Sequence, residues 1–387
     1  RYPEYLAHMR YVNSTVAAST AATAAAIKER DPHAKIGMDG VWNNNMGFNM
    51  ERILSDENIN TWGPYTRLPQ LEILRSIRPD LHHVTVWGWE TPPRAYPEAP
   101  WFNLLISWFI SGVGVGATKL AADYTPYHDH MQAELQTLRT GTAQTLIANP
   151  LAFDGIAIWE DYESTMASRL GDARFVQTIE SSMPLIETFY QKGLNFDYVV
   201  EDALNRLDEY DVLFLCGASA MSETAEQAIL RYVKNGGTVV SDLVPGLMND
   251  SWKVLEKNRL AALFGECAPT ELPPPVTNRL KLRGDLNGRN VSVEANKVRM
   301  FPGIPSFQVR NYGKGQAVLL NATLGSLRLG AKNDDFTHFL LDMLAAIGIE
   351  PNVTVDGLPP NSVVRVRRSN TFDLIGMTNR RMAKGGI

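Results

Sequence analysis

The sequence lacks several features that would define a class of protein at once. It contains only two cysteines, Cys216 and Cys267, which excludes a disulfide framework and a cysteine-based metal cluster. It has no apolar run near the roughly 18 residues that a membrane-spanning helix needs. Its formal net charge is -5, so neither nucleic acid nor an anionic membrane is expected as the main partner.

Other absences concern leaders and cofactors. There is no secretory signal, and the chain opens at Arg1 rather than methionine, so we expect the natural N-terminus to lie upstream. Localisation is left open, with the cytoplasm favoured. The glycine pair Gly236-Gly237 precedes an expected strand instead of opening a helix, which is not the arrangement of a phosphate loop. No cofactor and no metal are therefore expected.

The first 150 residues alternate strands with helices. Helices are predicted at residues 4–30, 50–54, 68–77, 101–111 and 128–147, and strands at residues 35–39, 59–62, 83–90 and 114–121. Strand, polar loop and helix thus repeat four times, which is the α/β pattern of a parallel sheet covered by helices. Four such units in this length of chain correspond to half of a (β/α)8 barrel, fewer than a closed barrel requires. We therefore expect the chain to be a fragment or to be completed by residues outside it.

A carboxylate marks the end of one of these strands. Glu90 closes the apolar run of residues 83–90, which stops at Thr91-Pro92-Pro93, where a strand cannot continue. In a (β/α)8 barrel the reactive residues lie at the C-terminal ends of strands. Polar and aromatic residues also fall at the other predicted ends, namely Asp39, Trp62, Tyr65 and Asp123. The alternative is that Glu90 is solvated or caps the next helix.

Residues 151–355 repeat the alternation with longer helices. Strands are predicted at residues 155–159, 196–200, 210–216, 238–241 and 316–321, and helices at residues 173–192, 222–234 and 336–346. Residues 160–171 are expected to form a polar loop, and residues 280–307 to form short strands. Single helices between strands indicate a doubly wound, flavodoxin-like sheet. Cys216 falls inside an apolar run, where a small buried side chain is expected.

A third unit is predicted at the end of the chain. Residues 362–368 and 371–377 alternate as a β-hairpin. The sequence thus predicts an α/β chain of three parts, with boundaries at residues 1–150, 151–355 and 356–387.

The order of these parts resembles the β-galactosidases of glycoside hydrolase family 42. Residues 207–240 and the stretch Val309-Arg310-Asn311-Tyr312-Gly313-Lys314-Gly315-Gln316-Ala317 carry most of the resemblance. It implies the C-terminal half of a (β/α)8 TIM barrel, then a flavodoxin-like (glutamine-amidotransferase-like) trimerisation domain, then the start of a small β-sandwich. It also implies a homotrimer.

The resemblance further implies a retaining glycoside hydrolase, β-galactosidase-like, that acts on a carbohydrate. Glu90, closing the seventh barrel strand, would be the nucleophile, and Tyr65 on the sixth strand would orient it. Trp62, Trp89 and Trp42 would offer flat faces to the sugar, although packing is the common role of a strand-end tryptophan. Asp39, Asn43 and Asp123 would contact hydroxyl groups.

Two other functions stay open. The general acid/base of the family is a glutamate after asparagine on the fourth strand, which would lie upstream of Arg1. The chain could therefore be a non-catalytic sugar-binding or scaffold protein on the same fold. A glutamine amidotransferase with Cys216 as nucleophile is disfavoured, because glycine flanks the cysteine on one side only and His338 is the only later histidine.

Overall fold

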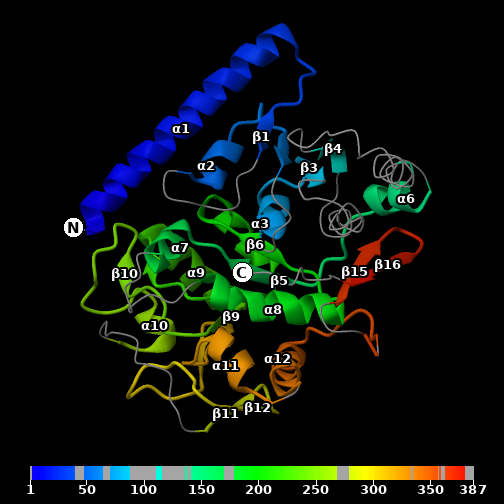
Figure 1. Ribbon diagram of the computed structural model, residues 1–387. Coiled ribbons are helices and arrows are strands. Elements are labelled where there is room, and N and C mark those ends of the chain that lie inside the picture. The colour runs from blue at the N-terminus through cyan, green and yellow to red at the C-terminus, as the bar shows by residue number, and fades with distance from the viewer. Residues whose placement is uncertain are drawn as a thin grey trace.

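The structure, a computed structural model, contains two parallel sheets with helices packed on them (Figure 1). It describes residues 2–39, 48–63, 70–87, 110–115, 136, 141–169, 178–267, 279–332, 334–355, 357–358 and 362–379.

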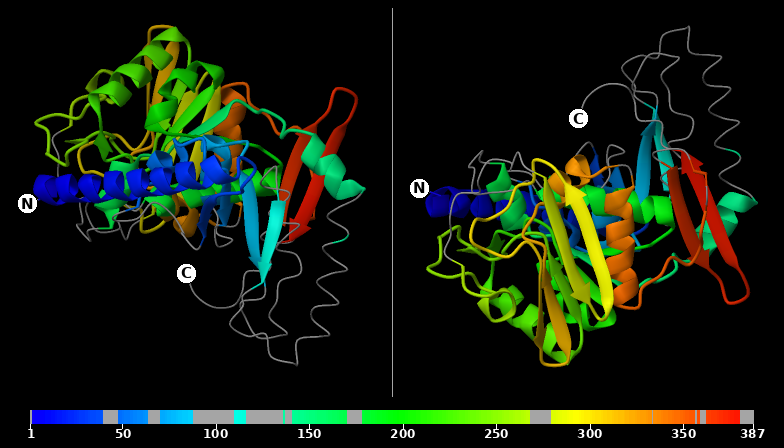
Figure 2. Two further views of the ribbon diagram at one scale, coloured as in Figure 1. Left: turned by 90° about the horizontal axis from the view of Figure 1, so that it is seen from above. Right: turned by 90° about the horizontal axis from the view of Figure 1, so that it is seen from below.

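The chain begins with one long helix, α1 (Tyr2–Arg30), which lies along one side of the molecule (Figures 1 and 2). Its middle is rich in alanine, the residue with the highest helix propensity. It ends before Pro32, which has no N–H to continue the ladder. Near its start, the amide of Asn13 donates to the hydroxyl of Tyr162 at 2.7 Å. The helix predicted from the sequence is confirmed.

The first sheet contains four parallel strands in consecutive order. They are β1 (Gly37–Asp39), β2 (Thr61–Gly63), β3 (His82–Trp87) and β4 (Ile110–Val115), with the helices α2 (Met50–Leu54) and α3 (Gln70–Ile77) between them. The predicted alternation of strand and helix is therefore confirmed from β1 to β3. The helix predicted at residues 101–111 lies outside the described residues except at its end, which belongs to β4.

Two predictions in this region are wrong. The strand predicted at residues 114–121 begins earlier, at Ile110, because Ile110, Val113 and Val115 supply β-branched residues where a helix was expected to end. The helix predicted at residues 128–147 is interrupted at Gly141, whose φ of 56° is not helical. The helix α6 (Thr142–Ala148) starts only after this glycine.

The second sheet has six strands in the order β13-β14-β9-β7-β5-β6. All are parallel to their neighbours except β13, which pairs antiparallel with β14. The strands are β5 (Ile156–Trp159), β6 (Asp197–Val199), β7 (Val212–Leu215), β9 (Thr238–Ser241), β13 (Gln308–Tyr312) and β14 (Gly315–Leu319). The five predicted parallel strands are confirmed, whereas the antiparallel strand β13 was not predicted and makes the sheet mixed.

Helices cover both faces of this sheet. They are α7 (Tyr162–Ser168), α8 (Thr178–Lys192), the 3-10 helix η3 (Glu201–Glu209), α9 (Glu223–Asn235), α10 (Ala261–Phe264), α11 (Leu324–Gly330) and α12 (Asp335–Ala346). Helix α7 corrects the expected loop at residues 160–171: Asp161 caps it by accepting from the N–H of Ser164 at 2.9 Å. Helices α10, α11 and η3 were not predicted from the sequence either.

Short antiparallel pairs complete the chain. One hairpin joins β11 (Leu280–Leu286) to β12 (Arg289–Ala295) through Asn287-Gly288, whose positive φ values of 52° and 82° suit a two-residue turn. The predicted C-terminal hairpin joins β15 (Ser362–Arg368) to β16 (Asp373–Asn379). Two further short strands, β8 (Ala220–Met221) and β10 (Met248–Asn249), pair in parallel.

The hydrophobic core runs through all three predicted parts. One cluster joins Trp62 and Leu74 of the four-stranded part to Phe189 of α8 and to Val363 of β15. A second cluster lies on the opposite face of the six-stranded sheet and includes Leu213. The first cluster thus contains residues from all three predicted parts.

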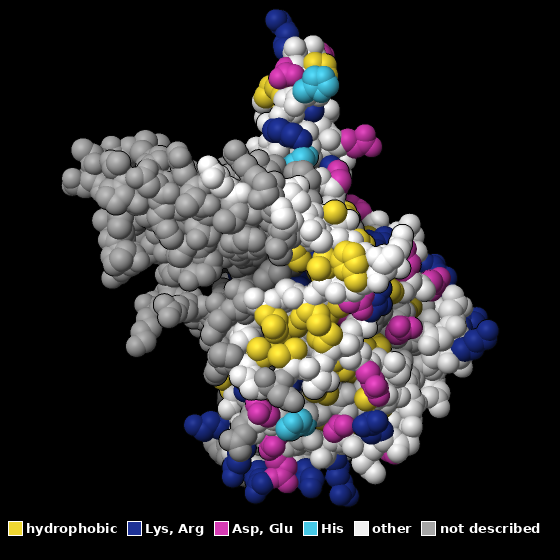
Figure 3. All heavy atoms as spheres, turned by 90° about the vertical axis from the view of Figure 1, so that its right-hand side faces the viewer, with side chains coloured by type: hydrophobic (Ala, Val, Ile, Leu, Met, Phe, Trp, Pro, Cys, Tyr) yellow, Lys and Arg dark blue, Asp and Glu magenta, His cyan; other side chains and the backbone are white. Residues whose placement is uncertain are grey.

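The surface shows a patch of hydrophobic side chains on the side where the C-terminal hairpin lies (Figure 3). Strand β16 exposes Ile375 by 49% and Met377 by 57%. None of the described helices is long and apolar enough to span a bilayer.

Candidate active site

The predicted reactive edge is formed by the C-terminal ends of β1 to β4. Asp39 pairs with Gly63 across the first two strands, and Trp87 pairs with Val115 across the last two. The four strand ends therefore lie along one edge, as in a barrel whose active site is at the C-terminal face. Glu90, Trp89, Tyr65, Trp42, Asn43 and Asp123 lie outside the described residues.

Two of the predicted site residues fall within the described chain. The backbone of Asp39 ends β1 beside the end of β2, at the predicted edge. Trp62 has no exposed surface, and its ring packs edge-on against Phe48 with the ring centroids 5.9 Å apart. Its buried indole N–H has no hydrogen-bond partner among the described residues. Trp62 therefore fills the core under the strand ends, the packing role named above as the alternative to a sugar platform.

The turn that leads into β3 is held by charged side chains. Arg78 forms an ion pair with Asp80 at 2.8 Å and donates to the carbonyl of Leu54 at 2.9 Å. The hydrogen bond from Arg78 holds the pKa of Asp80 below its usual value. At the start of the strand, the ring of His82 lies 2.7 Å from the ammonium of Lys35. The pKa of His82 is lowered by burial first and by Lys35 second, which favours the neutral ring.

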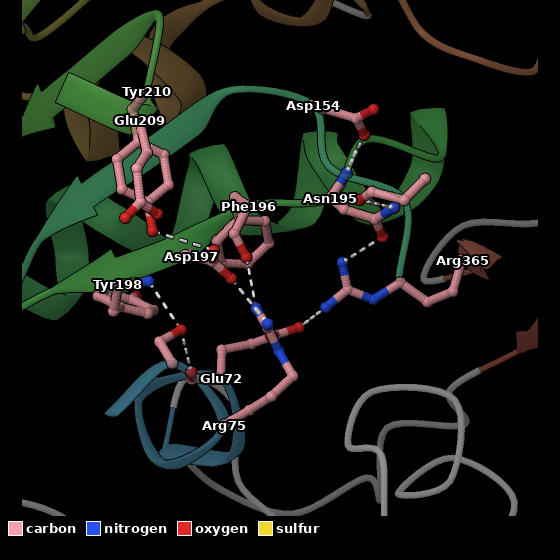
Figure 4. Close-up of polar contacts among 12 residues, drawn as sticks. Glu72, Arg75, Asp154, Asn195, Phe196, Asp197, Tyr198, Glu209, Tyr210 and Arg365 are labelled. Carbon is pink, nitrogen blue, oxygen red and sulfur yellow. Dashed lines mark hydrogen bonds and ion pairs between the residues drawn. The ribbon is translucent and has the colours of Figure 1, made fainter. Parts of the chain in front are cut away.

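Behind this sheet a buried ionic group, here called the Glu72 cluster, joins three parts of the chain (Figure 4). It comprises Glu72, Arg75, Tyr190, Asp197 and Arg365. Glu72 accepts from Arg75 at 2.8 Å and from the Tyr190 hydroxyl at 2.6 Å, and it forms an ion pair with Arg365. Arg75 also pairs with Asp197 at 2.7 Å. Both Glu72 and Arg365 are completely buried.

The hairpin strand β15 contributes two arginines to this interior. Burial and the neighbouring Arg367 lower the pKa of Arg365 to about 9. Burial and Arg75 lower the pKa of Arg367 to about 10. Both guanidiniums remain charged at neutral pH. Arg365 also donates to the side chain of Asn195 at 3.0 Å and lies over the ring of Tyr190, 4.7 Å from its centroid.

The arrangement of the Glu72 cluster is structural. Its two carboxylates are engaged by guanidiniums and hydroxyl groups, and Glu72 is closed to solvent. A catalytic carboxylate needs access to substrate, so this cluster holds α3 against β6 and β15 rather than performing chemistry. Its existence could not be inferred from the sequence, because its members are separated by long stretches of chain.

A second polar group, here called the carboxyl cluster, lies between α2 and the six-stranded part. It comprises Glu51, Asp161, Glu163 and Glu201. Burial, followed by repulsion from neighbouring carboxylates, raises the pKa of Glu51 well above its usual value. Burial likewise raises the pKa of Asp161 and of Glu201. Arg10 pairs with Glu163 at 2.9 Å.

The carboxyl cluster does not form a metal centre. No group of three potential ligands among the described residues is arranged to hold an ion. Several of its carboxyl oxygens are instead used in local hydrogen bonds. Asp161 caps α7, and Glu201 accepts from the hydroxyl of Ser222 at 2.5 Å.

Cys216 lies in the core and is only 3% exposed. Burial, with the nearby Asp242 and Glu160, raises the pKa of its thiol well above the usual value. A nucleophilic cysteine must be accessible and readily ionised. The predicted role of Cys216 as a small buried side chain is therefore confirmed. Its burial argues against the hypothesis of a glutamine amidotransferase, which would need Cys216 as its nucleophile.

Comparison with known proteins identifies the fold. No protein-family model matches the sequence. The cold-adapted β-galactosidase from Rahnella sp. R3 matches with a TM-score of 0.74 at 12% identity, covering 98% of this chain and 63% of that one. A GH42 β-galactosidase from G. stearothermophilus matches with a TM-score of 0.72 at 13% sequence identity, and the match covers 98% of this chain and 63% of that one. The GH42 exo-carrageenase from Bacteroides ovatus matches with a TM-score of 0.59 at 12% sequence identity, and the match covers 97% of this chain and 50% of that one.

These matches define an α/β fold of the kind found in glycoside hydrolases. More particularly, the chain resembles the GH42 β-galactosidases in structure, which confirms the resemblance drawn from its sequence. At this level of identity the likeness concerns the fold. The chain spans about 60% of the length of the β-galactosidases that it matches.

Proposed function

We propose that this chain belongs to a retaining glycosidase of the β-galactosidase type, with Glu90 as the nucleophile. The observation that carries the proposal is the four-stranded parallel sheet; in the sequence, Glu90 comes three residues after Trp87, where β3 ends. In a (β/α)8 barrel this is the place of catalytic residues. Structural similarity to GH42 β-galactosidases over 98% of the chain supports the same class of activity.

The proposed mechanism needs two carboxyl groups about 5–5.5 Å apart. Glu90 attacks the anomeric carbon and forms a glycosyl-enzyme intermediate, which water then hydrolyses. Tyr65 donates a hydrogen bond to Glu90 and keeps it ionised and aimed. A second carboxyl group is the general acid, and it later acts as the base. It protonates the leaving oxygen and then takes a proton from the water.

Sugar recognition is assigned to the same edge. Trp89 and Trp42 provide flat apolar faces for the sugar ring. Asp39, Asn43 and Asp123 provide hydrogen bonds to hydroxyl groups. Trp62 supports this edge from below, since its ring is buried.

The assembly proposal concerns residues 151–355. We propose that they form a trimerisation domain of flavodoxin-like architecture between a half-barrel at residues 1–150 and the start of a β-sandwich at residues 356–387. The parallel six-stranded sheet supports the flavodoxin-like assignment. Sedimentation equilibrium tests the trimer directly: a mass equal to one chain would contradict it.

The catalytic proposal is tested on the full-length natural protein with nitrophenyl β-galactoside. Glu90→Gln should lower kcat by about a thousandfold or more, because it removes the nucleophile. Glu57→Gln is the matched control, since Glu57 is exposed in the turn before β2. A 2-deoxy-2-fluoro galactoside should add one sugar to the peptide that contains Glu90, as detected by mass spectrometry. Equal activity of Glu90→Gln and the unmodified protein would remove the assignment.

The second candidate is a non-catalytic sugar-binding or scaffold protein on this fold. The observation that favours it is the burial of Trp62, a predicted sugar contact that has no exposed surface. Under this reading the full-length protein binds galactosides but hydrolyses none, and Glu90→Gln leaves the binding constant unchanged. Turnover of any glycoside that depends on Glu90 would exclude it.

A further inference from the structure

A polar pocket lies at the edge of the six-stranded sheet where β9 and β14 begin. Its volume is about 380 Å³, which is large enough for a molecule of the size of one sugar. Here called the Lys314 pocket, it is lined by Gly236, Thr238, Asn287, Asn311, Lys314, Gly315, Gln316, Ala346 and Ile347. In a doubly wound fold, ligands usually bind at the opposite edge, outside the carboxyl ends of the strands. The Lys314 pocket is therefore not at the edge where a doubly wound sheet usually binds its ligand.

Four separate segments form the walls, and hydrogen bonds hold them together. The amide of Asn287, in the turn between β11 and β12, donates to the carbonyl of Ala346 at the end of α12, at 2.9 Å. The amide of Gln316 donates to the hydroxyl of Thr238 at 3.4 Å. The N–H of Lys314 donates to the carbonyl of Lys234 at the end of α9, at 2.9 Å. The pocket is thus built before any ligand arrives.

Close packing at Gly315 also indicates that the pocket is rigid. A Cβ added at Gly315 would lie 2.2 Å from the carbonyl oxygen of Gly237, so no larger residue fits there without movement of the backbone. Gly315 starts β14, which pairs with β9. The floor of the pocket is therefore fixed to the central part of the sheet.

The polar groups of the pocket are only partly used by the protein. Within the described part of the chain, the ammonium of Lys314 makes no ion pair, and the side-chain amide of Asn311 makes no hydrogen bond. Asn287 and Gln316 each donate an amide N–H to the protein, and no hydrogen bond within the described residues uses their side-chain carbonyl oxygens. None of the described lining residues is acidic.

This set of groups selects a particular kind of ligand. One ammonium favours an anion, and amide groups exchange hydrogen bonds with hydroxyls. A lining in which only Ala346 and Ile347 carry purely apolar side chains disfavours a hydrophobic molecule. We propose that the Lys314 pocket binds a sugar unit that carries one anionic substituent. The substituent pairs with Lys314, and the hydroxyl groups bond to Asn311 and Gln316. The proposal is independent of Glu90, because every lining residue belongs to the six-stranded part.

Calorimetric titration of the intact chain tests the proposal with three sugars, each of which carries a different anionic group. Glucuronate carries a carboxylate, galactose 6-sulfate a sulfate and glucose 6-phosphate a phosphate. At least one should bind about tenfold more tightly than glucose or galactose, and its affinity should fall as salt concentration rises. Inorganic phosphate should bind about tenfold more weakly than glucose 6-phosphate, because it lacks the hydroxyl contacts.

Three variants make the test specific. Lys314→Gln should weaken binding of the anionic sugar by about tenfold, and Asn311→Ala by about threefold. Lys253→Gln, which changes an exposed lysine outside the pocket, should have no effect on binding. Unchanged far-ultraviolet circular dichroism would show that all three variants are folded.

Two results would overturn the proposal. Equal binding of the anionic sugar by Lys314→Gln and the unmodified chain would remove the pocket from the interaction. If no anionic sugar binds saturably while Lys314→Gln lowers Tm, then the ammonium only compensates the carbonyls at the C-terminal ends of α9 and α12.

Discussion

The Glu72 cluster and the carboxyl cluster both lie where helices of the four-stranded part meet the six-stranded part, but only the first balances its charges. In the Glu72 cluster, two carboxylates face the guanidiniums of Arg75 and Arg365. In the carboxyl cluster, Glu51 of α2 faces several carboxylates, and desolvation together with their repulsion raises its pKa. The two junctions therefore respond differently to pH.

The difference shows two ways of burying acidic groups. A buried carboxylate with guanidinium partners stays ionised, and removal of one partner leaves an uncompensated charge. A buried carboxyl group among other carboxyl groups favours its protonated form instead. The first junction is expected to tolerate changes in pH and to be sensitive to mutation. The second is expected to be sensitive to pH.

The largest effect on stability is expected from removing a guanidinium from the Glu72 cluster. Arg365→Met should lower the free energy of unfolding by about 3 kcal/mol, because Glu72 loses one of its two buried guanidinium partners. Urea denaturation followed by circular dichroism measures the change. Arg368→Met on the same strand is the control: Arg368 is exposed and pairs with Asp373, so its loss should leave stability nearly unchanged. Equal effects of the two variants would refute the importance assigned to the buried pair.

A smaller effect of opposite sign is expected at the carboxyl cluster. The folded-state pKa of Glu51 is raised above its usual value of 4.5, so the folded chain holds a proton that the unfolded chain releases. Stability is therefore highest below the unfolded pKa and falls as pH rises toward the folded pKa. Glu51→Gln should raise the free energy of unfolding by about 1 kcal/mol at pH 7 and change it little at pH 4.

Glu57→Gln serves as the control for this prediction, because Glu57 is exposed in the turn that follows α2. Denaturant unfolding at several pH values provides the measurement. A stability difference between Glu51→Gln and the unmodified chain that is the same at pH 4 and pH 7 would show that protonation of Glu51 is not involved.

The smallest effect is expected at Ser222, a helix cap that contacts the carboxyl cluster through Glu201. Ser222 accepts from the N–H of Ala225 at 3.0 Å and donates to Glu201 at 2.5 Å. Ser222→Ala should cost about 1 kcal/mol or less through loss of the cap. Because the bond from Ser222 lowers the pKa of Glu201, its removal should raise that pKa further.

Thr323→Ala is the control for Ser222→Ala, because Thr323 also caps a helix: it accepts from the N–H of Ser326 at 3.3 Å at the start of α11. The Thr323→Ala loss should be constant with pH. The Ser222→Ala loss should grow as pH rises from 4 to 7, because Glu201 then carries a larger penalty for ionisation. Parallel pH dependences in the two variants would contradict the role given to Glu201.

Local patterns predicted most of the elements correctly. Alanine-rich sequence and Pro32 predicted α1, and the serine cap of Ser222 with the glycines after Asn235 predicted both ends of α9. Errors arose where a local signal was ambiguous. Asp161 was assigned to a polar loop, although its side chain begins α7, and Gly141 was assigned to the interior of a helix that it interrupts.

The candidate site was predictable only in part. The alternation of strands and helices correctly indicated parallel strands whose ends share an edge, and it placed Asp39 there. It did not reveal that Trp62 points into the core, because a tryptophan at a strand end has the same local sequence whether it is buried or exposed. The ionic junction was missed entirely: Glu72 reads as an ordinary helix residue, and Arg365 as the polar position of a hairpin.

By itself the sequence determined the α/β class, the two parallel sheets, the C-terminal hairpin and the burial of Cys216. These follow from periodicity, caps and turn residues, which act over a few neighbouring positions. Only the tertiary structure decided which charges meet. Glu72, Asp197 and Arg365 come from three distant segments, and their pairing depends on how α3, β6 and β15 pack together. Burial and charge compensation are properties of that packing, so no local pattern in the chain records them.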